Sequence, residues 1–205
     1  MGVDALLLRK AVVAGSGLVY WAGVLIQAWR VRKQIGRWPN MMPRGTKERA
    51  LWFGWLLVIT VWIGQPFFVG EKAWVFVRLC PSLVHVAVMI PGLVLVVAGY
   101  AGTLWCYAIM GSAWRIGVNA QEKNALVTTG PFARVRHPIY ALQVVMLAGA
   151  FCLLPTACSL VLLAFHLVCV WLKAADEEAY LIATHGEAYR AHLARTGRLL
   201  PKFRR

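Results

Sequence analysis

Five long apolar runs constrain the fold of this chain more than any other feature of its sequence. Each is close to the roughly 20 residues that a helix needs to cross a bilayer. The chain is 60% hydrophobic and only 15% charged, whereas soluble domains average about 45–50% and about 25%. We therefore expect an all-α integral membrane protein with five transmembrane helices. The runs are residues 11–29, 51–69, 83–110, 139–154 and 156–172.

The runs also divide the chain into parts. Its 205 residues suit one domain, so we expect a single membrane domain over residues 1–205. Residues 1–110 would form three N-terminal spans. Residues 111–205 would form a connecting loop, a helical hairpin and a C-terminal helix. The hairpin is predicted because Pro155 is the only clear break between the last two runs.

The basic residues lie mainly in the connections between the runs, and their distribution predicts an orientation. The net charge is +1 before the first run, then +6, +1, +3 and 0 in the four connections, and +3 in the tail. Connections on the cytoplasmic side of a membrane carry the excess of Lys and Arg. The alternation predicts a multi-pass protein with its N-terminus outside and its C-terminal helix in the cytoplasm, and we expect a prokaryotic inner membrane.

The total charge of +14 could also indicate a protein that binds nucleic acid. Because this charge follows the membrane topology instead of forming one basic segment, we expect no nucleic acid partner. Five cysteines lie in or beside the apolar runs, and no two of them have CxxC spacing. Buried cysteines of this kind behave as small apolar residues, so we expect no metal site.

Two polar clusters flank the predicted hairpin. Arg136, His137 and Tyr140 lie at the start of the fourth run, and Glu177 and Glu178 follow the fifth. Ionisable groups at a membrane edge are costly to desolvate, so their gathering suggests function. The hairpin should bring both clusters to one cytoplasmic pocket. Adjacent helical residues point about 100° apart, which predicts that only one of the two glutamates faces the pocket at a time.

The same residues also have purely structural explanations. Arginines beside a span set the topology, and tyrosines form aromatic belts at membrane interfaces. A histidine such as His137 could be hydrogen-bonded without taking part in any reaction. The glutamates could lie on a solvated helix face and pair with Arg190 or Lys173.

Three blocks of sequence resemble a known family. LVTTGPFARVRHPIY covers residues 126–140, the pair EE covers residues 177–178, and HGEAYRAHLARTGRLLP covers residues 185–201. Together they resemble the isoprenylcysteine carboxyl methyltransferase family and its relatives, the phospholipid N-methyltransferases. The resemblance covers residues 111–201. It implies that S-adenosylmethionine is the cofactor and binds in the cytoplasmic pocket.

The resemblance also implies roles for individual residues. Glu177 and Lys173 would be catalytic, with Lys173 in place of an arginine that holds the acceptor carboxylate in the isoprenylcysteine enzymes. Gln121 is an alternative to Asn119 as a cofactor-binding amide in the connecting loop. The implied cofactor-binding residues are Asn119, Asn124, Ala125, Leu126, Val127, Phe132, His137, Pro138, Ile139, Tyr140 and Glu177.

The implied function is that of an integral membrane methyltransferase that uses S-adenosylmethionine and acts on the carboxylate of a prenylcysteine-like lipidic acceptor. Its partners would be a membrane lipid or prenylated acceptor and the bilayer itself. One alternative is N-methylation of a phospholipid or another small amphiphile. A second is a non-catalytic lipid-binding membrane protein. A third is a reductase, because sterol reductases share a related C-terminal pattern, although those enzymes are much longer and carry more spans.

Overall fold

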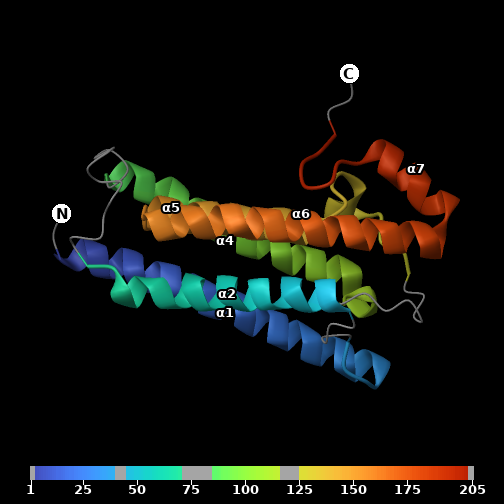
Figure 1. The fold of residues 1–205 in the computed structure, drawn as a ribbon, viewed down its shortest axis with the longest axis horizontal. Helices are drawn as coiled ribbons and strands as arrows, with labels where there is room; N and C mark the ends of the chain where they lie inside the picture. Colours follow the sequence, from blue (N-terminus) through green and yellow to red (C-terminus); the bar gives the residue numbers. More distant parts are fainter. Residues whose placement is uncertain (1–2, 40–44, 71–84, 116–124, 203–205) are drawn as a thin grey trace.

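The structure is a computed structural model that describes residues 3–39, 45–70, 85–115 and 125–202, and Figure 1 shows them as a bundle of long helices. Within these ranges the secondary structure is helical apart from an isolated β-bridge between Val135 and Gly197. The predicted all-α class is therefore confirmed. The elements are α1 (Val3–Ile35), α2 (Thr46–Phe68), α4 (Val86–Met110), α5 (Pro138–Leu153), α6 (Ala157–His185) and α7 (Glu187–Arg195), with short 3-10 helices η3 (Gly111–Ala113) and η4 (Gly130–Ala133).

Four of the described helices, α1, α2, α4 and α6, are long and apolar enough to cross a membrane. Helix α5 is apolar but has only 16 residues. At 1.5 Å per residue it is about 24 Å long, whereas the hydrocarbon core of a bilayer is about 30 Å thick. The multi-pass character follows from the four long helices, and the count of five spans stays a prediction.

Helix α6 differs from the predicted arrangement of its segment. A span over residues 156–172 and a separate tail helix were expected, but one helix runs continuously from Ala157 to His185. No proline or glycine interrupts this stretch, so the helix continues beyond its apolar part. It ends at Gly186, whose φ of +55° is accessible mainly to glycine. A further helix, α7, then begins at Glu187.

Helices α4 and α5 pack closely through glycines. A Cβ atom at Gly149 would lie 2.6 Å from the carbonyl oxygen of Gly92, and one at Gly99 would lie 2.3 Å from Met146 Cγ. Such small residues let helix backbones approach each other in a membrane, where van der Waals packing drives association. This contact fixes the start of α5, which carries the first polar cluster.

Two basic side chains of α1 cap other helices at the far end of the bundle. Arg9 is buried and donates a hydrogen bond of 3.1 Å to the carbonyl oxygen of Leu153, where α5 ends. Lys10 donates one of 2.8 Å to the carbonyl oxygen of Val69, just beyond α2. Cations at helix C-termini satisfy carbonyl groups that have no partner within the helix.

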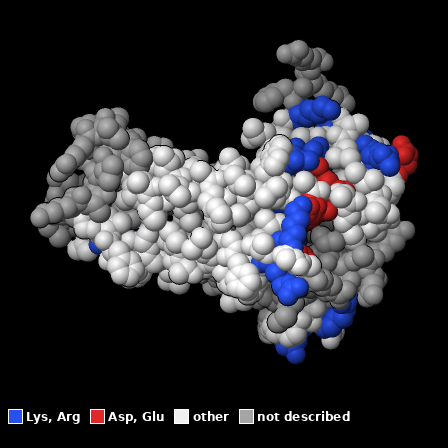
Figure 2. Space-filling model, viewed as in Figure 1, with Lys and Arg blue, Asp and Glu red and all other residues white. Residues whose placement is uncertain are grey.

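Most charged side chains on the visible face gather at the opposite end of the bundle, near the end of α6 and near α7, as Figure 2 shows. The first turn of α2 lies at this end too, because Lys47 pairs with Asp176 of α6 at 2.6 Å. The start of α5 also reaches it, through the ion pair between Arg136 and Glu178. Helices α5 and α6 therefore run in opposite directions, and both polar clusters meet at the charged end.

Candidate functional site

A cavity of about 200 Å³ opens among the helix ends at the charged end of the bundle. All of the predicted cofactor-binding residues that the structure describes line this cavity. Asn119, Asn124 and the alternative Gln121 lie outside the described residues. The lining residues that the sequence predicted are Ala125, Leu126, Val127, Phe132, His137, Pro138, Ile139, Tyr140 and Glu177.

The cavity also has walls that the sequence analysis missed. Helices α1 and α2 contribute aromatic side chains, although no motif in the N-terminal half pointed to them. Gln143 of α5 donates a hydrogen bond to the hydroxyl of Tyr20. Both are polar residues inside apolar runs, and this property could have identified them from the sequence. The missed lining residues include Tyr20, Trp21 and Val24 of α1, Trp55 of α2, Tyr107 and Met110 of α4, Gln143 of α5, Tyr180 and Leu181 of α6, and Tyr189 and His192 of α7.

The local sequence places His137 and Tyr140 on one side of α5. Pro138 occupies the first turn of the helix, where its missing N–H and fixed φ are tolerated. His137 is the N-cap residue, and Tyr140 follows one helical turn later. Their rings stack with centroids 5.6 Å apart and planes 9° from parallel. The two side chains therefore present a common face to α6.

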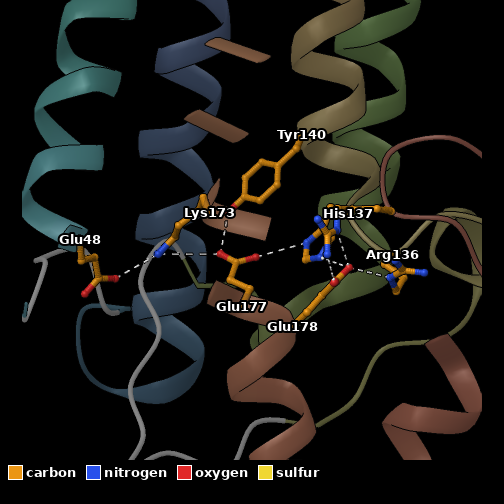
Figure 3. Close-up of polar contacts among 8 residues, drawn as sticks. Glu48, Arg136, His137, Tyr140, Lys173, Glu177 and Glu178 are labelled. Carbon is orange, nitrogen blue, oxygen red and sulfur yellow. Dashed lines mark hydrogen bonds and ion pairs between the residues drawn. The ribbon is translucent and has the colours of Figure 1, made fainter. Parts of the chain in front are cut away.

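Glu177 receives both of these side chains, as Figure 3 shows. The Tyr140 hydroxyl donates a hydrogen bond of 2.6 Å to Glu177 Oε1. His137 Nδ1 lies 3.3 Å from Glu177 Oε2. Glu177 lines the cavity and its side chain is 20% exposed. The geometry fixes the orientation of a carboxylate that is open to a ligand.

Glu178 is held in a different environment. Arg136 Nε donates a hydrogen bond of 2.7 Å to Glu178 Oε1, and Arg198 binds both carboxylate oxygens. His137 Nε2 lies 3.5 Å from Glu178 Oε1. Only one glutamate was expected to face the pocket, and within the described residues Glu177 alone of the pair lines the cavity. His137 nevertheless contacts both, because it lies between them.

This arrangement changes the acid–base properties of His137. Burial lowers its pKa, but the hydrogen bonds and charges of Glu177 and Glu178 raise the pKa more, so that it lies above the ordinary value. The protonated imidazole is therefore favoured between the two carboxylates. In the protonated form both ring nitrogens are donors, which suits one carboxylate on each side.

The segment 196–198 holds the loop that carries Arg136 and His137. The Arg136 amide donates to the Gly197 carbonyl oxygen at 2.8 Å, and the His137 amide donates to that of Arg198 at 3.1 Å. The Arg136 side chain also donates to the Thr196 carbonyl oxygen. The Arg198 guanidinium lies 4.5 Å from the ring centroid of Trp171. We call residues 196–198 the latch.

Lys173 lies beside the cavity but is absent from its lining. Its Nζ is 3.0 Å from Glu48 Oε1 of α2 and 4.0 Å from Glu177 Oε1. Its side chain is only 9% exposed. The structure therefore brings both predicted catalytic residues together, but it shows Lys173 paired with carboxylates of this chain. The catalytic roles of Lys173 and Glu177 stay predictions.

Comparison with known proteins agrees with the position of this site. Residues 92–183 match the isoprenylcysteine carboxyl methyltransferase (ICMT) family. The matched segment holds α5, the first polar cluster and both glutamates, and it ends before the latch. A search of curated proteins gave no match. The family match confirms the resemblance predicted from the sequence: residues 92–183 are similar to the isoprenylcysteine carboxyl methyltransferase family.

Proposed function

We propose that this protein transfers the methyl group of S-adenosylmethionine to the carboxylate of a prenylcysteine-like lipidic acceptor. The observation that carries the proposal is that the predicted cofactor-binding residues, drawn from residues 125–140 and from Glu177, line one cavity. They come from segments far apart in the sequence. A binding site for one ligand explains why they meet.

The residues of the cavity fit this cofactor. Bound S-adenosylmethionine would supply a methyl group on a positively charged sulfonium, which is already activated for transfer. The Glu177 carboxylate faces the cavity and suits a cation. Ala125, Leu126 and Val127 also line the cavity. Tyr140 and His137 hold the carboxylate in one orientation, which matters because transfer depends mainly on alignment.

The reaction needs little acid–base chemistry when the acceptor is a carboxylate. A carboxylate oxygen forms the new bond to the methyl carbon, and the carbon–sulfur bond breaks with its electron pair left on sulfur. The products are a methyl ester and S-adenosylhomocysteine, and no proton is transferred. The main requirements on the protein are to align the two reactants and to exclude water.

The apolar part of the acceptor would lie against α1 and α2. Tyr20, Trp21 and Trp55 line the cavity from these helices, and Met110 adds an apolar side chain from α4. Aromatic side chains bind apolar ligands and keep polar atoms available for their orientation. A lipid acceptor would enter from the bilayer while the soluble cofactor enters from the charged end.

An amine acceptor is the second candidate, and the contacts of Lys173 favour it. The expected cation for an acceptor carboxylate is paired with Glu48 and lies outside the cavity lining. An amine would instead need a group that accepts its proton, and Glu177 is the carboxylate that faces the cavity. The acceptor would then be a phospholipid or another small amphiphile.

Transfer of a labelled methyl group from S-adenosylmethionine to a panel of acceptors tests the proposal. We expect product with prenylcysteine and saturable binding of S-adenosylhomocysteine in calorimetry. Glu177→Gln should weaken cofactor binding by roughly tenfold, as expected when one charged contact is lost. Glu187→Gln is the matched control, because Glu187 is 90% exposed and pairs only loosely with Arg190 at 3.6 Å. Absence of cofactor binding to the wild-type protein would support a non-catalytic lipid-binding protein, and product from phosphatidylethanolamine alone would support the amine acceptor.

A further inference from the structure

Glu48 connects the N-terminal half of the chain to the candidate site. It lies in the first turn of α2, far from the matched residues 92–183. Its Oε1 lies 3.0 Å from Lys173 Nζ, and its side chain is 23% exposed. Figure 3 shows Lys173 between Glu48 on one side and Glu177 on the other. One ammonium is therefore shared by two carboxylates.

Of Glu48, Lys173 and Glu177, only Glu177 acts directly on a ligand in the cavity. Lys173 and Glu48 are absent from the cavity lining, whereas Glu177 is part of it. Partly buried charges are weakly screened by solvent, so the ammonium of Lys173 acts on Glu177 over 4.0 Å. With Glu48 in place, the positive charge of Lys173 is compensated. Without Glu48, that charge would offset the negative charge of Glu177.

We propose that Glu48 is a positioning residue that acts through Lys173 and Glu177: by compensating the charge of Lys173, it keeps the cavity selective for a cationic ligand over a neutral one. This inference rests on the proposed function, since S-adenosylmethionine carries a positively charged sulfonium and S-adenosylhomocysteine a neutral thioether. Glu48 therefore favours binding of the methyl donor over binding of the demethylated product. Lys173 opposes this preference, and Glu48 limits how much of its charge reaches Glu177.

The same two helices carry a second ion pair that differs in one respect. Lys47 of α2 pairs with Asp176 of α6 at 2.6 Å, but the Lys47 side chain is 65% exposed. Solvent screens exposed pairs, which contribute little to stability or to distant potentials. Lys47 adjoins Glu48 in sequence, so Lys47→Met changes the charge of the same helical turn by one unit. It is the matched control.

The test measures the affinities of the purified full-length protein for both ligands by calorimetry. The quantity of interest is the affinity ratio of S-adenosylmethionine to S-adenosylhomocysteine. Glu48→Gln should lower this ratio by roughly threefold to tenfold, the size expected for one partly screened charge. Lys173→Met should raise it, since the positive charge near Glu177 is gone. The double variant Glu48→Gln/Lys173→Met should have an affinity ratio near the wild-type value. Lys47→Met should leave the ratio unchanged.

The outcomes separate a charge effect from a structural one. Equal affinity ratios in all variants would overturn the proposal. A ratio that falls in both Glu48→Gln and Lys173→Met, and falls further in the double variant, would overturn it too. Glu48→Asp keeps the charge and should keep the ratio, so it serves if Glu48→Gln does not fold. If the wild-type protein binds neither ligand, the proposed function fails and the inference fails with it. If it binds both and the ratio does not respond, the inference alone fails.

Discussion

His137 lies between two glutamate carboxylates whose other contacts differ. Glu177 faces the cavity and accepts a hydrogen bond from Tyr140. Glu178 is buried and binds Arg136 and Arg198. A carboxylate that is fully paired within the protein is a structural anchor, whereas one that is oriented but open to a cavity can bind a ligand. His137 contacts both carboxylates and so links the anchored Glu178 to Glu177.

The raised pKa of His137 predicts how stability changes with pH. Because its folded-state pKa is above the unfolded value of about 6.5, the protonated ring stabilises the fold fully below that value. This contribution is lost as the pH rises through the higher folded pKa. We expect the unfolding temperature of the wild-type protein to fall as the pH rises from the unfolded pKa of His137 to its folded pKa. The fall should be larger than that of His137→Gln over the same pH range.

The comparison of the two proteins isolates His137 from other titrating groups. Burial, and then the charge of Arg136, lowers the pKa of His192, so this residue has the opposite dependence on pH. The charge of His137 is the smallest of the causes that lower the pKa of His192, so most of the contribution of His192 is present in both proteins. Thermal unfolding in detergent at several pH values provides the measurement. Identical pH profiles for the two proteins would show that His137 is not charged in the fold.

At the scale of elements, the latch joins residues 134–137 to α6. Its backbone pairs with residues 134–137, and its Arg198 side chain reaches Glu178 of α6 and covers Trp171. Gly197 permits the turn that follows, because a Cβ atom there would lie 1.8 Å from the carbonyl oxygen of Leu200. The latch lies beyond the family match, which ends at residue 183.

We predict that Arg198→Ala weakens both the fold and cofactor binding. The variant loses a bidentate contact to the buried Glu178, while Arg136 still compensates that charge. A loss of about 1–2 kcal/mol of stability follows, with a clear drop in affinity for S-adenosylhomocysteine. Arg190→Ala is the control, since this arginine is 60% exposed. Denaturant unfolding and calorimetry measure the two effects, and an unchanged affinity would show that the latch does not position His137.

The contact between α4 and α5 supports a second prediction at this scale. Gly149→Ala places a methyl group where the backbone oxygen of Gly92 stands 2.6 Å away. The backbone cannot move aside as a flexible side chain can, so we expect a destabilisation of about 1–3 kcal/mol. A Cβ atom at Gly15 of α1 would have no packing neighbour within 4 Å, and Gly15→Ala should be neutral or stabilising. Comparable losses in both variants would contradict close packing as the cause.

At the scale of the whole molecule, charge and apolar surface separate. Figure 2 shows most charged side chains of the visible face at one end of a largely uncharged body. The candidate site opens at that end, among the helix ends that carry the charges. Such a molecule can receive a soluble ligand at one membrane surface and a lipid from within the bilayer.

The charge distribution predicts that this end faces the cytoplasm. A reporter that is active only in the cytoplasm should function when fused after residue 205, and one that needs export should not. Replacing the basic residues between positions 30 and 49 by neutral ones should weaken this preference, because Lys and Arg set the orientation. Activity of the exported reporter at the C-terminus of the wild-type chain would contradict the predicted topology.

The sequence by itself determined the helical class, and its family resemblance pointed to residues that line the cavity, among them Ala125, Phe132, His137, Tyr140 and Glu177. Apolar runs suffice for the helices, because backbone groups in lipid must be satisfied within each segment. The tertiary structure decided that Glu177 and not Glu178 lines the cavity, that α1 and α2 complete it, and that Lys173 pairs with Glu48. Surfaces that face lipid and surfaces that face other helices are equally apolar, so hydropathy does not encode how each helix is rotated. Pairings such as Glu48 with Lys173 depend on that rotation and arise only when the helices pack.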